Sequence, residues 1–347
     1  MMDLRFVRDR AQRSGVLLAG LLCLPVAAPA QDDLTDVIAF RNHHPFLQIF
    51  GVPVFQSATL AAEGSLKYDF NIEITNHADQ GLNANETFEV DGETYSMKLS
   101  LRHRLWQRIE LGVDVPVISH QGGFLDNIIK EWHDVLSVSN SNRSGPKDQL
   151  NFLYESGGVT QYELTSSTFG LGDIQLTAAV PLKEASAQSP AAFTVRTSVK
   201  LPTGDEQDLH GSGALDFSAG LYASTKATLF NRPLGLTGFA GALLLGDGDI
   251  LPDLQRSTVA FGGVAARLQA MERLGITIQV YAQDDYFDAD IDKLGGSTFQ
   301  LGIGLDWHMP RRGLSLSFAI AEDPLSDATP DIAMQFSVRS SNRRSAP

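Results

Sequence analysis

The strongest constraint on the fold of this chain is an alternation of apolar and polar residues that recurs along most of its length. Between residues 312 and 322, for example, Leu314, Leu316 and Phe318 alternate with serine and alanine. Successive side chains of a β-strand point to opposite faces of the sheet. A period of two therefore predicts strands that have one apolar and one polar face.

Twelve segments follow this pattern, although two of them are too rich in glycine and alanine to show a clear face. Tilted strands need about ten residues to cross a bilayer, which matches the length of the segments. The chain after residue 30 holds no apolar run of about 18 residues, so no membrane-spanning helix is expected. The predicted strands are 64–76, 92–106, 108–119, 171–183, 191–202, 213–229, 233–246, 257–270, 274–285, 297–309, 312–322 and 330–340.

The links between these segments are alternately short and long. A soluble barrel or sandwich also shows alternation, because its interior is apolar and its surface is polar. Short turns on one side, long loops on the other and an even number of strands are instead typical of bacterial outer-membrane barrels. We therefore predict an all-β fold: a transmembrane antiparallel up-and-down β-barrel of about 12 strands, with both termini on the periplasmic side.

The N-terminus has the pattern of an export signal. Four arginines precede the apolar run GVLLAGLLCLPVAA, which contains the only cysteine, and a small-residue cleavage pattern ends at Ala30. Removal of residues 1–30 takes away four basic and two acidic residues and changes the formal net charge from −14 to −16. So acidic a chain is not expected to bind nucleic acid. We expect it in the outer membrane of a Gram-negative bacterium, after cleavage near Ala30.

Beyond the predicted signal peptide, 1–30, the chain divides into three parts. Residues 31–60 are expected in the periplasmic opening of the barrel or inside its lumen, 61–340 form the barrel, and 341–347 are a polar tail. The first part contains the aromatic stretch FRNHHPFLQIFGVP, with His43 and His44 side by side. Neighbouring side chains of an extended backbone point apart, so no metal site is predicted there.

The longest predicted loop, 120–170, contains a short amphipathic helix over residues 122–137. Apolar residues recur there at helical spacing. The helix is expected to constrict the barrel mouth, lie on the membrane surface or bind a partner, and the sequence leaves the three open. The candidate residues are Phe124, Ile128, Trp132 and His133.

The polar faces of the predicted strands carry charges of both signs. They either line a charged channel or neutralise one another in pairs that stiffen the wall. We favour the second interpretation, because a barrel of twelve strands is narrow and partly filled by side chains. The predicted lumen-lining residues are Lys67, Asp69, Glu73, Lys98, Arg102, Arg104, Glu110, Asp114, Asp173, Arg196, Lys200 and Asp216.

The stretch VKLPTGDEQDLHGSGALDF is predicted to be a hairpin at the barrel rim. Pro202 ends the outgoing strand because it has no N–H for the next ladder hydrogen bond. Thr203, Gly204 and Asp205 follow in the exposed turn, where glycine and aspartate are favoured. Asp205 is expected to accept hydrogen bonds from loop amides or to pair with Lys200.

Two serine–histidine neighbours raise the alternative of a lipid-modifying hydrolase built into the barrel. They are Ser119 with His120, and His210 with Ser212. A nucleophile and its base must lie within hydrogen-bond reach, whereas adjacent strand residues face opposite ways. Both pairs also lie in loop-like, glycine-rich sequence. We therefore predict that the protein is not an enzyme.

Five motifs occur in a fixed order along the chain: NHHPFLQIFGVP, GGFLDNIIKEWHDVLSVSNSNR, GLGDIQL, LPTGD and GSGALDF. In these motifs the chain resembles a family of Gram-negative outer-membrane barrels that is defined by sequence and has no assigned function. That family is distantly similar to the porin-like barrels encoded beside phenol- and hydrocarbon-degradation pathways. The resemblance implies the fold and the location, and it supplies no catalytic residues.

Together these features predict a monomeric barrel for the passive passage or binding of small molecules, hydrophobic ones included. The lipid-modifying hydrolase and a non-conducting structural barrel remain as alternatives. The expected partners are outer-membrane lipid and lipopolysaccharide, an unidentified solute and the barrel-assembly machinery. No cofactor, metal or nucleic acid is expected.

Overall fold

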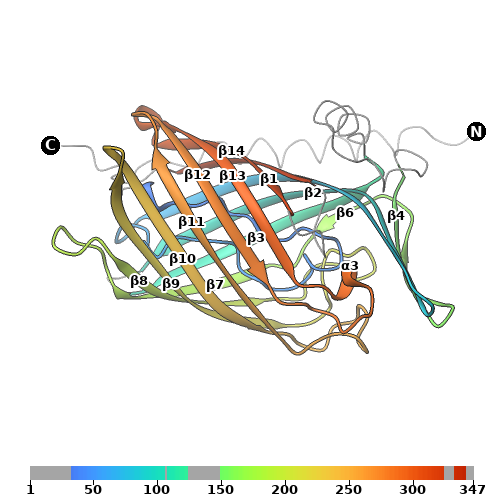
Figure 1. The fold of residues 1–347 in the computed structure, drawn as a ribbon. Helices are drawn as coiled ribbons and strands as arrows, with labels where there is room; N and C mark the ends of the chain where they lie inside the picture. The colour runs from blue at the N-terminus through green and yellow to red at the C-terminus, as the bar shows by residue number, and fades with distance from the viewer. Residues whose placement is uncertain (1–32, 106–107, 124–148, 324–331, 341–347) are drawn as a thin grey trace, which may run out of the picture.

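The computed structural model describes residues 33–105, 108–123, 149–323 and 332–340, and twelve of its strands close a β-barrel (Figure 1). The closed order is β1-β2-β3-β7-β8-β9-β10-β11-β12-β13-β14-β15, and β15 pairs back onto β1. The strands are β1 (Leu66–Leu82), β2 (Glu86–Arg104), β3 (Glu110–Gln121), β7 (Gln175–Lys183), β8 (Ala192–Lys200), β9 (Asp216–Leu229), β10 (Arg232–Leu244), β11 (Thr258–Gln269), β12 (Leu274–Gln283), β13 (Thr298–Met309), β14 (Leu314–Glu322) and β15 (Ile332–Ser340).

Every pair of neighbouring strands in the barrel is antiparallel. Each of the twelve predicted segments overlaps one barrel strand, so the predicted fold class is confirmed. Short turns join the strands at one end of the barrel. Long loops join them at the other end, where the four-residue helix α3 (Asp292–Gly295) lies (Figure 1). No helix among the described residues is long and apolar enough to cross a membrane.

The long-loop end differs from the prediction at two places. Residues 77–91, expected as a loop, continue the β1–β2 hairpin, and the expected loop 120–170 contains three further strands. Phe88 and Val90 of β2 pair with Tyr154 and Phe152 of β4, and all four are buried. These apolar residues pack against the lumen contents, which explains why strand pairing continues beyond the membrane. The three strands are β4 (Asn151–Ser156), β5 (Val159–Leu164) and β6 (Thr168–Leu171).

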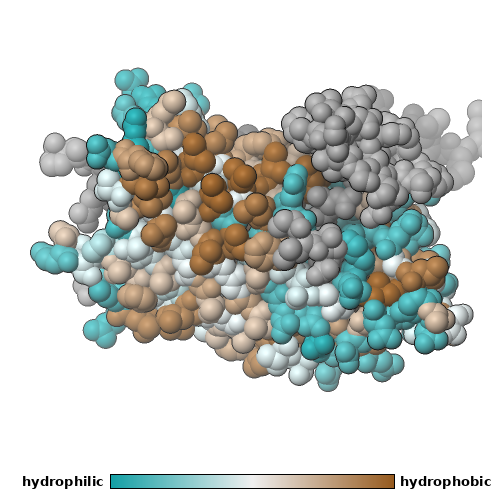
Figure 2. Space-filling model, in the orientation of Figure 1, coloured by the Kyte–Doolittle hydropathy of each residue, from teal (hydrophilic) through white to brown (hydrophobic). Residues whose placement is uncertain are grey.

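The outer face of the barrel is apolar and the inner face polar. On β13, Leu305 and Trp307 are 46% and 48% exposed, while Asp306 between them is 2% exposed. Figure 2 shows apolar side chains gathered over the middle of the barrel and hydrophilic ones toward its ends. A lipid-facing band bounded by polar ends is the pattern of a transmembrane barrel.

Residues 33–65, which we call the lumenal segment, run inside the barrel and not along its wall (Figure 1). The segment starts beside β10 at the short-turn end, where the 3-10 helix η2 (Asp33–Thr35) contacts that strand. It reaches the long-loop end and turns there, with the amides of Leu47 and Gln48 donating to the carbonyl of His44. It then returns to enter β1. Its apolar side chains form the core of the molecule.

The amphipathic helix predicted over 122–137 lies, apart from Gly122 and Gly123, outside the described residues. This applies to its candidate residues Phe124, Ile128, Trp132 and His133.

Candidate functional site in the barrel lumen

One side of the lumen, formed by β9 to β12 and the loop after β12, is lined by aromatic rings. Phe55 of the lumenal segment lies 4.4 Å from Phe239, and Phe239 stacks on Tyr222 at 5.0 Å, both measured between ring centroids. Nearer the long loops, Phe50 stacks on Tyr286 at 4.9 Å. We call Tyr222, Phe239, Phe261, Tyr281, Tyr286 and Phe287 the aromatic wall; all six are buried.

Glycine on β11 makes room for the Phe55 ring. A Cβ atom at Gly263 would lie 3.3 Å from Cε1 of Phe55 and 2.8 Å from Cε1 of Phe239. The sequences of β10 and β11 are rich in glycine, and for that reason they show no clear apolar and polar faces. Their glycines instead make room for aromatic rings inside the barrel.

The opposite side of the lumen is charged, and its side chains hold the backbone of the lumenal segment. Arg196 donates to the carbonyl oxygen of Ser57 at 2.8 Å and pairs with Glu110 at 3.0 Å. Glu110 in turn accepts the amide of Ala61 at 2.7 Å. A buried polar group must find a hydrogen-bond partner, and here the wall and the segment satisfy each other.

The structure places all twelve predicted lumen-lining charges on the inner side of the barrel, and most are paired. The ion pairs are Lys67–Asp36, Arg102–Asp114, Arg104–Glu184, Arg196–Glu110, Lys200–Asp173, Lys200–Asp216 and Glu73–His43. Asp69 lines a cavity described below. Lys98 is 8% exposed and makes no hydrogen bond or ion pair within the described part of the chain.

The rim hairpin is folded around two charged residues, Lys200 and Asp173. The Lys200 ammonium lies 2.7 Å from Asp173 and 3.2 Å from Asp216, and it donates to the carbonyl of Ile49 at 3.0 Å. Asp173 Oδ1 accepts the amides of Thr203 and Gly204 at 2.9 and 2.8 Å. The motifs GLGD, LPTGD and GSGALDF therefore meet at one point in space.

Asp205 accepts the amide of Gln207 at 2.9 Å through its side chain. Of the two roles expected for it, the structure shows the hydrogen bond to a loop amide. The pairing with Lys200 is wrong, because Asp173 and Asp216 hold that ammonium instead. Pro202 and Thr203 lie where the strand ends, and the Thr203 hydroxyl donates to the carbonyl of Gly172 at 2.9 Å.

A second ion-pair network, on β11, β13 and β15, was not predicted from the sequence. Arg267 pairs with Asp306 at 3.2 Å, and Arg339 pairs with the other oxygen of Asp306. Arg339 also donates to the carbonyl of Val37 at 3.1 Å, which ties the start of the lumenal segment to the last strand. The alternation of residues on β13 places Asp306 on the polar face, and this pattern could have indicated that Asp306 lies in the lumen.

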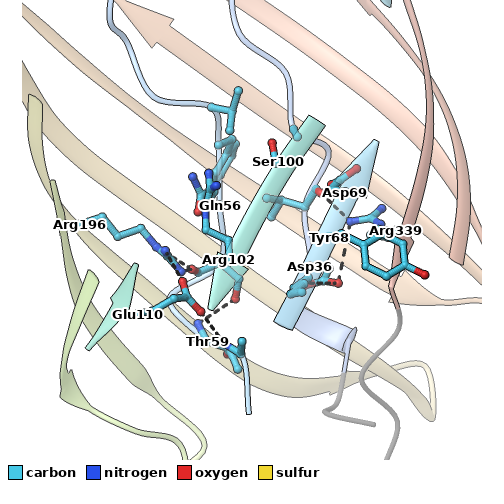
Figure 3. Close-up of a pocket in the computed structure, with 17 residues that line it drawn as sticks. Asp36, Gln56, Thr59, Tyr68, Asp69, Ser100, Arg102, Glu110, Arg196 and Arg339 are labelled. Carbon is cyan, nitrogen blue, oxygen red and sulfur yellow. Dashed lines mark hydrogen bonds and ion pairs between the residues drawn. The ribbon is translucent and has the colours of Figure 1, made fainter. Parts of the chain in front are cut away.

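A cavity of about 80 Å³ lies between the lumenal segment and the charged side, toward the short-turn end (Figure 3). Arg102, Arg196 and Arg339 reach it from three strands, and Asp36 and Gln56 reach it from the segment (Figure 3). Burial alone would raise the pKa of Asp36, but Lys67 and Arg339 outweigh it and hold this pKa below its usual range. The cavity has room for several water molecules, since about 10–15 Å³ suffices for one.

A smaller cavity of about 20 Å³ lies farther along the segment, and Val54 lines both cavities. Lys98, Arg41 and Asp114 line the smaller one. Nε of Arg41 and Oδ1 of Asp114 have no hydrogen-bond partner among the described residues. Polar atoms left in this way inside a protein are usually satisfied by bound water. The described part of the lumen is thus largely filled, and a further void of about 10 Å³ lies between Pro53 and Gln56 of the segment and the wall.

The two serine candidates contact groups other than histidine rings. Ser119 donates to the carbonyl of Thr168 at 2.7 Å, and Ser212 accepts from Lys200. Among residues 33–105, 108–123, 149–323 and 332–340, no hydrogen bond joins either hydroxyl to a histidine ring, and no group of three side chains is placed to hold a metal ion.

Comparisons with known proteins agree with this architecture. The profile of a family described as "Protein of unknown function (DUF3187)" matches residues 18–341. Among curated proteins no significant match is found. The COG4313 outer membrane channel from Pseudomonas putida F1 superposes with a TM-score of 0.51 at 12% identity, covering 81% of this chain and 96% of that chain.

Two further solved structures superpose less closely. The NanC porin has a TM-score of 0.44 at 8% identity, covering 80% of this chain and 99% of that chain. The toluene transporter TbuX from Ralstonia pickettii has a TM-score of 0.39 at 8% identity, covering 81% and 90%. At 12% identity, the likeness to the Pseudomonas channel establishes the fold alone.

Proposed function

Because this chain belongs to the DUF3187 family and has the fold of an outer-membrane channel, we propose that it binds small apolar molecules in its lumen and passes them across the bacterial outer membrane. Passage is passive and involves no chemical step. The long loops face the cell exterior, and the short turns face the periplasm, as in other barrels of this kind.

The observation that carries this proposal is the way in which the lumen is closed. The lumenal segment fills it and contains no β-strand among its described residues, so the strand ladder of the barrel does not depend on it. Wall side chains such as Arg196 and Asp216 hold its backbone. Water can replace such hydrogen bonds at a net cost of only about 1 kcal/mol each, or about twice that for charged groups. In the proposed function this segment is the gate, and its opening exchanges these hydrogen bonds for bonds to water and exposes the apolar side chains that it buries in the core.

The aromatic wall supports the choice of apolar molecules. Phe50 and Phe55 occupy it when the gate is closed, with ring distances of 4.9 Å to Tyr286 and 4.4 Å to Phe239. Withdrawal of the segment would leave a row of rings along one side of the lumen. Such a surface gains free energy from apolar solutes at about 25 cal/mol per Å² of buried area.

Planar-bilayer recording tests the proposal with two variants. Deletion of residues 36–62 is expected to turn rare, small openings into stable, larger conductance steps, and to create saturable binding of the apolar dye N-phenylnaphthylamine. The pair Gly51→Cys and Asp216→Cys locks the gate instead. A Cβ at Gly51 would lie 2.9 Å from that of Asp216, within about 1 Å of disulfide geometry. The lock should silence the channel until a reductant is added.

A non-conducting structural barrel is the second candidate, and the filled lumen favours it. The cavities found beside the segment among the described residues are small, at about 80, 20 and 10 Å³. In that case the deletion variant would fold and insert but remain silent and bind no dye. The single variants Gly51→Cys and Asp216→Cys serve as controls for the lock, since neither can form the disulfide.

A further inference from the structure

Five of the eight histidines of the chain lie together near the long-loop end of the lumen. His43 and His44 belong to the tip of the lumenal segment, His77 to β1, His120 to β3 and His210 to the rim loop 201–215. We call these five residues the histidine layer. It lies where the segment reverses direction, between the gate, the wall and the rim loop.

The rings of this layer are in close contact across the boundary between gate and wall. The centroids of His44 and His77 are 6.0 Å apart, and those of His120 and His210 are 5.7 Å apart with their planes inclined by 26°. His44 also stacks on Phe88 at 5.9 Å. His44, His77 and His120 have no measurable exposure to solvent.

Hydrogen bonds connect three members of the layer, His43, His77 and His120, whereas both ring nitrogens of His44 have no hydrogen-bond partner among the described residues. Thr94 Oγ1 lies 2.9 Å from Nδ1 of His120 and 3.1 Å from Nε2 of His77. Gln48, at the tip of the gate, lies between His43 and His120 at 3.4 and 3.5 Å. An uncharged imidazole has one donor and one acceptor nitrogen, which suits such a network, whereas the charged ring has two donors.

Charged groups of both signs lie around the layer. Arg41, Lys98, Asp114, Asp173 and Lys200 line the smaller cavity together with His43 and His210. Glu73 pairs with His43, and Lys293 of α3 faces His44 while it pairs with Asp79 of β1. Asp205 and Asp208 of the rim loop face His210. On the neighbouring strands, Glu93 bonds Tyr95 of β2, Glu86 of β2 bonds Tyr154 of β4, and the Tyr162 hydroxyl of β5 donates to Gln207. No carboxylate among the described residues forms an ion pair with His44, His77 or His120.

Burial dominates the titration of the two loop histidines for which the shift is clear. It lowers the pKa of His44 to about 3, helped by the positive charge of Lys293. It also lowers the pKa of His210, against the opposing effect of Asp208 and Asp205. Both rings are therefore uncharged at neutral pH in the closed state and would take up protons if released to water, where histidine titrates near pH 6.5.

We propose that the histidine layer is an acid-sensitive latch, which holds the lumenal segment in the barrel at neutral pH and releases it on acidification. Protons bind the open state more tightly than the closed one, so acid shifts the population toward the open state. Several rings repel one another once charged, which makes the release steeper than one proton would. The inference rests on the proposed function only in that the segment is taken as the gate.

The experiment measures exposure of the gate directly, in the refolded full chain. In a Cys23→Ser background, Leu47→Cys places one thiol at the buried tip of the segment, where Leu47 is 3% exposed. Its reaction rate with dithiodipyridine, a reagent active in acid, is divided by the rate of free cysteine at each pH. We expect the ratio to rise below pH 6, by roughly tenfold per pH unit for each proton taken up.

Replacement of His44, His77 and His120 by glutamine, which stays uncharged, should flatten this rise to within about twofold. His103→Gln is the matched control, because His103 lies at the far end of β2 and bonds the carbonyl of Ser65; it should leave the profile unchanged. A difference in gel migration between unheated and heated samples verifies folding of each variant. A profile that is flat in the parent, or equally steep in the triple variant, would overturn the latch.

The outcomes separate the latch from the proposed function. If thiol exposure follows the expected pH profile while the deletion variant conducts no current and binds no dye, the acid-sensitive latch is supported and the proposed passage of solutes is wrong. If the deletion variant conducts while thiol exposure does not depend on pH, the proposed passage is supported and the latch is wrong.

Discussion

Replacing Lys200 by methionine should be among the most damaging single substitutions in the barrel. The ammonium is 3% exposed and is paired with two carboxylates, Asp173 at 2.7 Å and Asp216 at 3.2 Å. At an effective dielectric constant of about 20, these contacts correspond to gross attractions of about 6 and 5 kcal/mol. Desolvation of the three ions offsets most of this. Removing one partner of a buried ion pair nevertheless costs about 3–5 kcal/mol, because a charge is left without compensation.

The assay is urea unfolding of the refolded barrel in detergent or lipid vesicles, followed by tryptophan fluorescence. Lys200→Met should lower the free energy of unfolding by about 3–5 kcal/mol. The double variant Lys200→Met/Asp216→Asn should recover part of the loss. Its remaining carboxylate, Asp173, still accepts the amides of Thr203, Gly204 and Ser212. Lys183→Met, at an exposed position, is the control and should change stability by less than about 0.5 kcal/mol.

A loss below about 1 kcal/mol for Lys200→Met would refute this reasoning. So would a double variant that is no more stable than the single one. Either result would mean that the two carboxylates find other compensation, such as water from the neighbouring cavity that Lys200 lines.

Three further substitutions test other parts of the site. Gly204→Ala should lower the free energy of unfolding by about 1–3 kcal/mol, because the new Cβ would lie 2.4 Å from the carbonyl oxygen of His210. Gly238→Ala is the control in the same unfolding assay, and it should have little effect because the nearest atoms to its Cβ would be 3.6 Å away. The free energy of unfolding should fall as the pH drops below about 6.5, because burial depresses the pKa of His210 in the folded state and the unfolded chain then binds the proton more tightly. His210→Gln should weaken this pH dependence. If stability depends equally on pH in the parent and in the variant, the role assigned to His210 is wrong. Arg196→Met should raise the frequency of channel openings severalfold, because it removes the hydrogen bond from Arg196 to the carbonyl of Ser57 in the lumenal segment. Unchanged bilayer recordings would show that this hydrogen bond does not hold the gate.

The alternation of residues predicted the barrel well because lipid on one side and a polar lumen on the other impose the same demand along every strand. Leu305, Asp306 and Trp307 on β13 show this pattern directly. The extension of the β1–β2 hairpin was missed because its apolar residues, such as Phe88, bury against the lumen contents instead of lipid. On β10 and β11 the cause is different: glycine and alanine give neither face a clear polarity, so the alternation did not show that Arg267 points into the lumen.

The sequence did not predict which charged residues form ion pairs with one another. Lys200 was placed in the lumen, but its pairing with Asp173 depends on residues 172–174, which interrupt the strands between β6 and β7 and turn that carboxylate inward. The five-histidine layer was also not foreseen. Its members are separated by up to 167 positions (from His43 to His210) and meet only once the segment lies inside the closed barrel.

The position of the lumenal segment also has a consequence for assembly of the barrel. Its hydrogen bonds reach across almost the whole sequence: the amide of Ile38 bonds Gln279, and Arg339 bonds the carbonyl of Val37, 302 residues away. Contacts at such separation form late and slowly. The seam between β1 and β15 is the last to become available, since one of its strands is made last. A chain that closed this seam around an empty lumen would have to thread the segment in afterwards, whereas a segment already in place offers the later strands an internal template around which to wrap.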